Sequence, residues 1–150
     1  MKESYFYAIL REEFAILKKA FRGASSGNGN LIPLRDRCDS LHRGLCMRLL
    51  NDFIVPADRV DLFRISYGIL SFLEVLLCSN LKGKDVETLR KLVEILVSDP
   101  FSSGEVALRR ADGVALLKGD RTSLSPDGKA CFVAGERLCV LLTEFAIRNG

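Results

Sequence analysis

The sequence predicts an all-α fold, an antiparallel helical bundle, from three observations. Apolar residues recur three or four positions apart in successive segments, which is the spacing of amphipathic helices. Short stretches rich in Gly, Ser, Pro and Asp separate these segments, and short connections favour antiparallel neighbours. The length of 150 residues, 48% of them hydrophobic, suits one domain with a sizeable core.

The first three predicted helices are the longest ones. The stripe of the first includes Phe6, Phe14 and Phe21, and a second stripe runs from Leu34 to Leu49. "GASSGNGN" between them has the composition of a flexible loop. The third helix is apolar nearly all round, which predicts a central position, but charged residues make it too short for a membrane span. The predicted ranges are 4–22, 31–52 and 56–81.

Three further helices are expected after "LKGKD" turns the chain, at 85–98, 103–118 and 127–148. "SDPFSSG" breaks the pattern near 99–103. The predicted organisation is therefore one helical domain, 1–150. Within it, residues 1–98 hold the first three helices and the fourth, and residues 103–150 hold diverged C-terminal helices. Three long helices are thus expected to be followed by a shorter, incomplete second bundle.

Composition excludes several classes of function. A formal charge of +3 is too small to indicate a nucleic-acid partner. The five cysteines include no C-x-x-C pair, and the acidic residues of "MKESYFYAILREEF" do not suit a secretory signal. We therefore expect free thiols and a cytoplasmic protein. With one histidine and neither a Gly-rich phosphate loop nor a serine elbow, the chain is not expected to be an enzyme.

The stretch "FIVPADRVDLFRIS" (53–66) places a polar corner before the third helix. Pro56 suits a first helical turn, and Asp58 and Asp61 suit the positive end of the helix dipole. Arg59 is expected to pair with Asp52 or with a carboxylate one turn away. Two interpretations stay open here, a simple helix start and a surface that faces a partner.

The longer stretch "LHRGLCMRLLNDFIVPADRVDLFRI" (41–65) resembles the signature of PhoU-like proteins, the accessory or regulatory proteins associated with Pit-type inorganic phosphate permeases. Six corner residues match, and Asp39 stands at the matching distance before them. The specific portion of the resemblance covers 36–78. The matching corner residues are Phe53, Ile54, Pro56, Asp58, Arg59 and Asp61.

The resemblance implies two three-helix bundles and a non-enzymatic role in controlling phosphate transport. The expected partner is an inorganic phosphate permease, contacted peripherally at the cytoplasmic side of the inner membrane. The resemblance leaves open which transporter is bound, whether phosphate or metal is sensed, and whether a homodimer forms. It also leaves open whether the short C-terminus is natural or truncated.

PhoU-like relatives hold iron or zinc with acid-x-x-x-Asp pairs, whose members lie on one helix face. This chain departs from that pattern, because Arg35 stands at an acid position, and Leu70 and Ser71 replace carboxylates of the third helix. Arg148 likewise stands where the last helix usually has an aspartate. Three polar side chains at helical spacing on the second helix could still share an inner face with one acid of the third helix. These candidate ligands are Asp36, Asp39, His42 and Glu74.

Because opposing ligands are missing, we expect no cofactor and at most a weakly held divalent or transition metal. A solvated polar face is the alternative interpretation of the same residues. A second class of function stays open as well, a winged-helix DNA-binding module with a β-hairpin wing near 114–133. It would place Arg109, Arg110, Lys118 and Arg121 near phosphates, but these residues form no basic stripe.

Overall fold

The computed structural model describes residues 5–27, 30–51 and 56–149, and all regular structure in these ranges is helical. The all-α prediction is therefore confirmed for the described ranges of the chain, and each of the six expected helices is present. The elements in order are α1 (Tyr5–Ser26), α2 (Ile32–Asn51), α3 (Ala57–Leu77), α4 (Gly83–Val97), α5 (Gly104–Leu117), η1 (Lys118–Ser123) and α6 (Pro126–Asn149).

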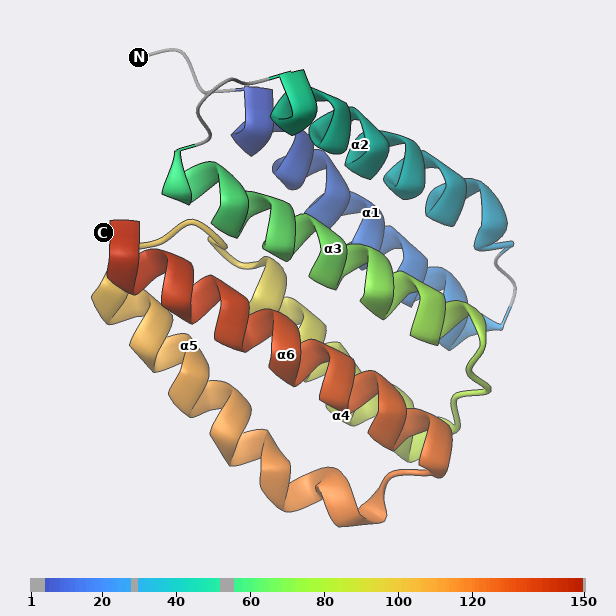
Figure 1. The fold of residues 1–150 in the computed structure, drawn as a ribbon. Helices are drawn as coiled ribbons and strands as arrows, with labels where there is room; N and C mark the ends of the chain where they lie inside the picture. Colours follow the sequence, from blue (N-terminus) through green and yellow to red (C-terminus); the bar gives the residue numbers. More distant parts are fainter. Residues whose placement is uncertain (1–4, 28–29, 52–55, 150) are drawn as a thin grey trace.

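The helices form two halves of three, α1–α2–α3 and α4–α5–α6 (Figure 1). Within each half the three helices pack on one another. The halves meet where α3 packs on α6 and where α1 packs on α4, so α2 and α5 lie on the outer sides. Buried apolar side chains from all six helices form one continuous core.

The third helix of each half lies at the centre of the molecule. Helix α3 contacts α1, α2 and α6, which agrees with its nearly continuous apolar sequence. Helix α6 approaches closely because Gly135 has no side chain. A Cβ atom there would lie 2.5 Å from Leu92 Cδ2 and 3.1 Å from Phe72 Cε2. The glycine thus lets α6 pack against α3 and α4 together.

Two predicted helix ends are off by four residues: α1 extends to Ser26 instead of residue 22, and α3 stops at Leu77 instead of residue 81. Helix α1 thus includes "GASS", and the hydroxyls of Ser25 and Ser26 donate to the carbonyls of Arg22 and Gly23 one turn back. Helices α4 and α5 are short, with 15 and 14 residues, but α6 has 24. The expectation of three shorter helices in the second half is therefore wrong for the last one.

The β-hairpin that the winged-helix alternative needs near 114–133 is not formed. The end of α5, the short helix η1 and the start of α6 occupy this stretch. Asp85 fixes the junction, since its carboxylate accepts from the backbone N–H of Ser125 at 2.8 Å and from the Ser125 hydroxyl at 2.6 Å. Leu124 is buried beside it. The winged-helix alternative therefore lacks its wing.

Candidate functional site

Asp36 and Glu74, two of the predicted metal ligands, lie on either side of the Arg35 guanidinium. Arg35 on α2 donates from Nε to Asp36 Oδ1 at 2.9 Å and from Nη1 to Glu74 Oε1 at 3.3 Å. A guanidinium that bridges two carboxylates provides the positive charge that a metal ion would otherwise provide. The pair Asp36 and Glu74 is thus brought together, but around an arginine.

The other two candidates point in different directions. Asp39 pairs with Arg43, one turn along α2, at 2.9 Å. The His42 ring is buried and turns toward α3. In the ranges that the structure describes, no three His, Cys, Asp or Glu side chains gather as metal ligands would.

His42 belongs to a different group, which we call the Glu13 cluster: Glu13, Cys38, His42 and Ser66. The Ser66 hydroxyl lies 2.8 and 2.9 Å from the two Glu13 carboxylate oxygens and 2.9 Å from His42 Nδ1. Cys38 Sγ lies 3.3 Å from Glu13 Oε2. The cluster joins α1, α2 and α3, and both Glu13 and Ser66 are 0% exposed.

Burial controls the electrostatics of this cluster. It raises the pKa of Glu13 to about 7, although hydrogen bonds from Ser66 and Cys38 act to lower it. Burial also raises the pKa of the Cys38 thiol, and the Glu13 carboxylate raises it further. The pKa of His42 is lowered by burial, against the opposing charge of Asp39. Near neutral pH the cluster therefore contains a carboxyl close to its midpoint, a thiol and an uncharged imidazole.

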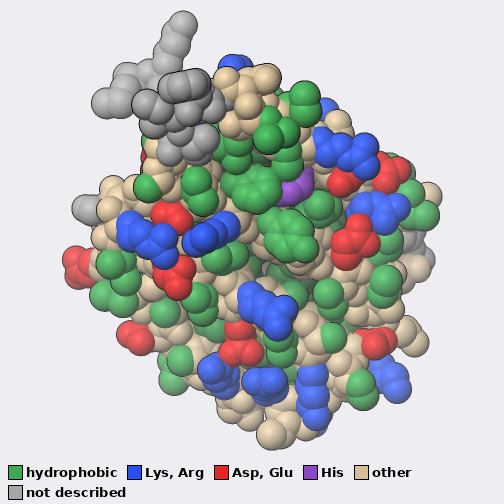
Figure 2. Space-filling view, viewed as in Figure 1, with side chains coloured by type: hydrophobic (Ala, Val, Ile, Leu, Met, Phe, Trp, Pro, Cys, Tyr) green, Lys and Arg blue, Asp and Glu red, His purple; other side chains and the backbone are tan. Residues whose placement is uncertain are grey.

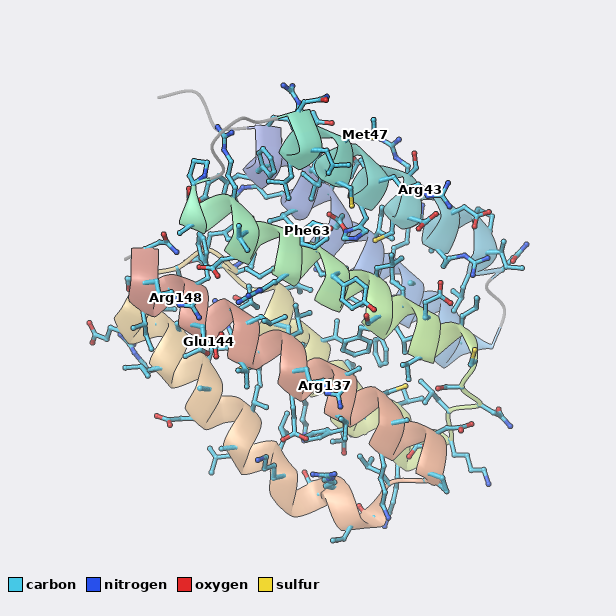
Figure 3. All side chains as sticks on the ribbon, in the orientation of Figure 1. Arg43, Met47, Phe63, Arg137, Glu144 and Arg148 are labelled. Atoms are coloured by element: carbon cyan, nitrogen blue, oxygen red, sulfur yellow. The ribbon has the colours of Figure 1, made fainter. Side chains whose placement is uncertain are left out.

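This arrangement suits proton binding better than covalent chemistry. A reactive cysteine needs a lowered pKa and an accessible sulfur, and Cys38 has neither. Ser66 is enclosed between Glu13 and His42, with no exposed surface for a substrate. The His42 ring stacks on Phe63 with 4.9 Å between centroids, and Figure 3 labels Phe63 on α3.

Glu13 and Ser66 are not among the predicted site residues, although the sequence carries a signal for both. Glu13 falls in the apolar stripe of α1, between Leu10 and Leu17. Ser66 falls in the stripe of α3, between Leu62 and Ile69. A polar residue inside a buried stripe implies a polar partner on a facing helix, because burying it alone is costly.

The predicted corner residues connect α3 to helices other than α2. Asp58 lies in the first turn of α3, as expected, and Pro56 is the N-cap residue. Asp61 accepts from Arg148 Nη1 at 2.8 Å, which ties the start of α3 to the end of α6. The Arg59 guanidinium lies over the Phe6 ring of α1, 5.1 Å from its centroid. The expected pairing of Arg59 with Asp52 concerns a residue outside the described ranges.

Exposed apolar side chains occur at the end of the bundle where α1 begins, α2 ends and α3 begins (Figure 1), which we call the corner end. Leu50 is 79% exposed and Met47 is 59% exposed, and Tyr5 and Val60 are also exposed. Arg48 lies over the Tyr5 ring at 4.3 Å. The corner end therefore combines apolar side chains with arginines, a composition found at protein interfaces.

The four basic residues of the winged-helix alternative are engaged elsewhere. Arg110 is buried and donates to the Asp99 carbonyl and, at 2.9 Å, to the Ser102 hydroxyl. Lys118 and Arg121 flank Glu136 at 3.2 and 3.6 Å. Arg109 pairs with Glu105 along α5. This set does not form a surface that could follow a phosphate backbone.

Comparison of the chain with protein-family models, curated proteins and solved structures finds no match. Within the described ranges, no helix has the length and apolarity needed to cross a membrane.

Proposed function

We propose that the protein is a non-enzymatic, PhoU-like accessory or regulator of inorganic phosphate transport that binds a permease at its cytoplasmic side. The arrangement of two three-helix halves carries this proposal, because the sequence resemblance at 36–78 implies that architecture. The resemblance rests on residues of α2 and α3, whereas the arrangement involves all six helices.

The two halves also correspond helix by helix. Each has its middle helix, α2 or α5, on the outside, and each joins the other through its first and third helices. Both third helices begin at a proline, Pro56 as the N-cap of α3 and Pro126 as the first residue of α6. Such a correspondence supports a repeat of one three-helix unit, as the proposed family requires.

The corner end is the proposed permease-binding surface. Its exposed leucine and methionine can be covered by an apolar partner, while Arg48 and Arg59 lie against aromatic rings. Tyr, Met and Arg are enriched in interfaces, and a few such residues carry most of the binding energy. The protein would act by binding, and the binding would affect the conformation of the permease.

The test is co-purification with a phosphate permease encoded in the same genome, in detergent and at fixed salt. Leu50→Glu should weaken the association at least ~10-fold, because a charge replaces an apolar contact. Leu116→Glu is the matched control, since Leu116 is 82% exposed at the far end of α5 and should leave binding unchanged. Equal binding by both variants, or no capture of the permease by the unmodified protein, would contradict the proposal.

A second copy of the chain is the other occupant that the corner end could take. Light scattering on the protein alone distinguishes the two cases. A homodimer through this surface would dissociate in Leu50→Glu and persist in Leu116→Glu. A monomer in both variants leaves the permease as the proposed partner.

A further inference from the structure

We propose that Glu13, Ser66 and His42 form a buried proton-binding site in which uptake of one proton from solvent reverses the direction of the hydrogen bonds. This inference does not depend on the proposed role in phosphate transport. It rests on three short contacts between side chains of three helices.

The Ser66 hydroxyl has one proton, so it can donate to only one of its two neighbours. With Glu13 ionised, Ser66 donates to the carboxylate and accepts from His42 Nδ1–H. With Glu13 protonated, the carboxyl donates to Ser66, and Ser66 donates to His42 Nδ1. Each of these hydrogen bonds is kept in both states, and the Cys38 thiol donates to Glu13 Oε2 in each.

His42 gives this hydrogen-bond chain a route to solvent. Its residue is 8% exposed, whereas Glu13 and Ser66 have no exposed surface. The purple side chain in Figure 2, the one histidine of the sequence, reaches the surface between apolar side chains. A solvent proton binds His42 Nε2, the Nδ1 proton passes to Ser66 Oγ, and the Ser66 proton passes to Glu13. One proton is gained, the charge of Glu13 is neutralised, and no bond between heavy atoms changes.

The charges around Glu13 explain why the proton is held there. On α1, Glu12 lies beside it and pairs with Arg37 of α2 at 2.8 Å. Helix α2 contributes the uncharged Cys38, and α3 contributes the Ser66 hydroxyl. Among the described residues, neither these helices nor α4, which also packs on α1, places a Lys or Arg against Glu13.

Further groups face the histidine end of the hydrogen-bond chain. Asp39 of α2 is paired with Arg43, and its charge acts to keep the His42 ring protonated. The uncharged ring of Tyr67 on α3 lies against the imidazole, with 5.9 Å between centroids. A buried carboxyl without a cation holds its proton, and the pKa of Glu13 is accordingly raised to about 7.

The sign of the effect on stability follows from this raised pKa. The folded protein holds the Glu13 proton more tightly than the unfolded chain, where the ordinary value of 4.5 applies. The stabilisation is fully present below that value and is lost as the pH rises through about 7. His42 acts in the opposite sense, since its pKa is lowered, and its contribution is lost as the pH falls.

Glu13→Gln separates the two effects, because it keeps the shape of the side chain and removes its titration. Urea unfolding gives the folding equilibrium constants of the unmodified protein and of the variant. The ratio of the first constant to the second should fall about 100-fold between about pH 5 and about pH 8. Glu105→Gln, which changes an exposed carboxylate on the outer helix α5, is the matched control and should give a nearly constant ratio. A constant ratio for Glu13→Gln as well would overturn the proposal.

A second measurement needs no variant and remains decisive if Glu13→Gln fails to fold. The untagged chain has a single histidine, so its ¹⁵N resonances report one ring without assignment. We expect the neutral Nδ1–H tautomer at high pH and the neutral Nε2–H tautomer after Glu13 takes up its proton. One unchanged neutral tautomer across the titration, or a ring that becomes charged with no tautomer change first, would show that the hydrogen bonds do not reverse.

Discussion

Asp61 and Arg148 form an ion pair between residues that are far apart in the sequence. The Asp61 side chain is 9% exposed, and its Oδ1 accepts from Arg148 Nη1 at 2.8 Å, while the described residues give Oδ2 no hydrogen-bond partner. Figure 3 labels Arg148 and Glu144 one turn apart at the end of α6. No spacing rule connects positions 61 and 148, so this pair could not be predicted from the sequence. The acid of the corner thus has a structural partner supplied by the second half.

Removal of the arginine should leave Asp61 as a nearly buried carboxylate without a cation. We expect Arg148→Ala to lower the free energy of unfolding by about 1–3 kcal/mol. Adding Asp61→Asn should recover some of this loss, because the uncompensated charge is then gone. Urea denaturation measures both effects, and Arg109→Ala on the exposed pair with Glu105 is the control, expected below ~0.5 kcal/mol. Losses that simply add in the double variant would mean that the two residues do not interact.

Arg35 determines what we expect of metal binding. Its guanidinium lies between Asp36 and Glu74, where a bound cation would be repelled, and Asp39 is paired with Arg43. The protein should purify without stoichiometric transition metal, and a chelator should leave its Tm unchanged. Elemental analysis and thermal unfolding measure these two outcomes. One or more tightly held ions per chain, lost on Asp39→Ala, would restore the cluster-binding interpretation of the family.

At the scale of helices, the apolar spacing predicts all six elements, because most helices bury one continuous stripe. It fails where the spacing is ambiguous. Val114, Leu116 and Leu124 can be read as an alternating strand, but Val114 and Leu117 are the buried pair and Leu116 is 82% exposed, as in a helix. Apolar spacing does not predict the Glu13 cluster, because spacing describes the residues of one helix at a time. The hydrogen-bond partners of Glu13 on α1 lie on α2 and α3.

Helix α3 offers the test of this element-level packing. Leu73 is buried on the side of α3 that faces the core, so Leu73→Ala should lower the free energy of unfolding by about 2–5 kcal/mol. The same truncation at the exposed Leu116 removes little buried surface and should cost less than ~0.5 kcal/mol. Chemical denaturation compares the two. A Leu73→Ala variant as stable as Leu116→Ala would mean that this face of α3 is exposed and available to a partner.

At the scale of the whole molecule, the two halves share one core. Buried side chains of all six helices form a single cluster, and the Tyr7 ring of α1 meets the Phe145 ring of α6 with 6.2 Å between centroids. Helices α3 and α6 pack closely at the centre, so each half covers part of the surface of the other. Neither half has a separate core of its own, so unfolding of one should expose apolar surface of the other.

We therefore expect the halves to unfold in one cooperative transition. All three tyrosines lie on α1 and α3, and the chain has no tryptophan, so intrinsic fluorescence comes from the first half, although Tyr7 also contacts Phe145 of α6. The buried thiols of Cys131 and Cys139 lie on α6 and follow the second half by their reactivity. Urea midpoints from tyrosine fluorescence, from labelling of these two cysteines and from far-UV circular dichroism should coincide. Labelling of α6 at a lower urea concentration than the fluorescence change would show that the second half opens first, and the shared core would then not couple the two.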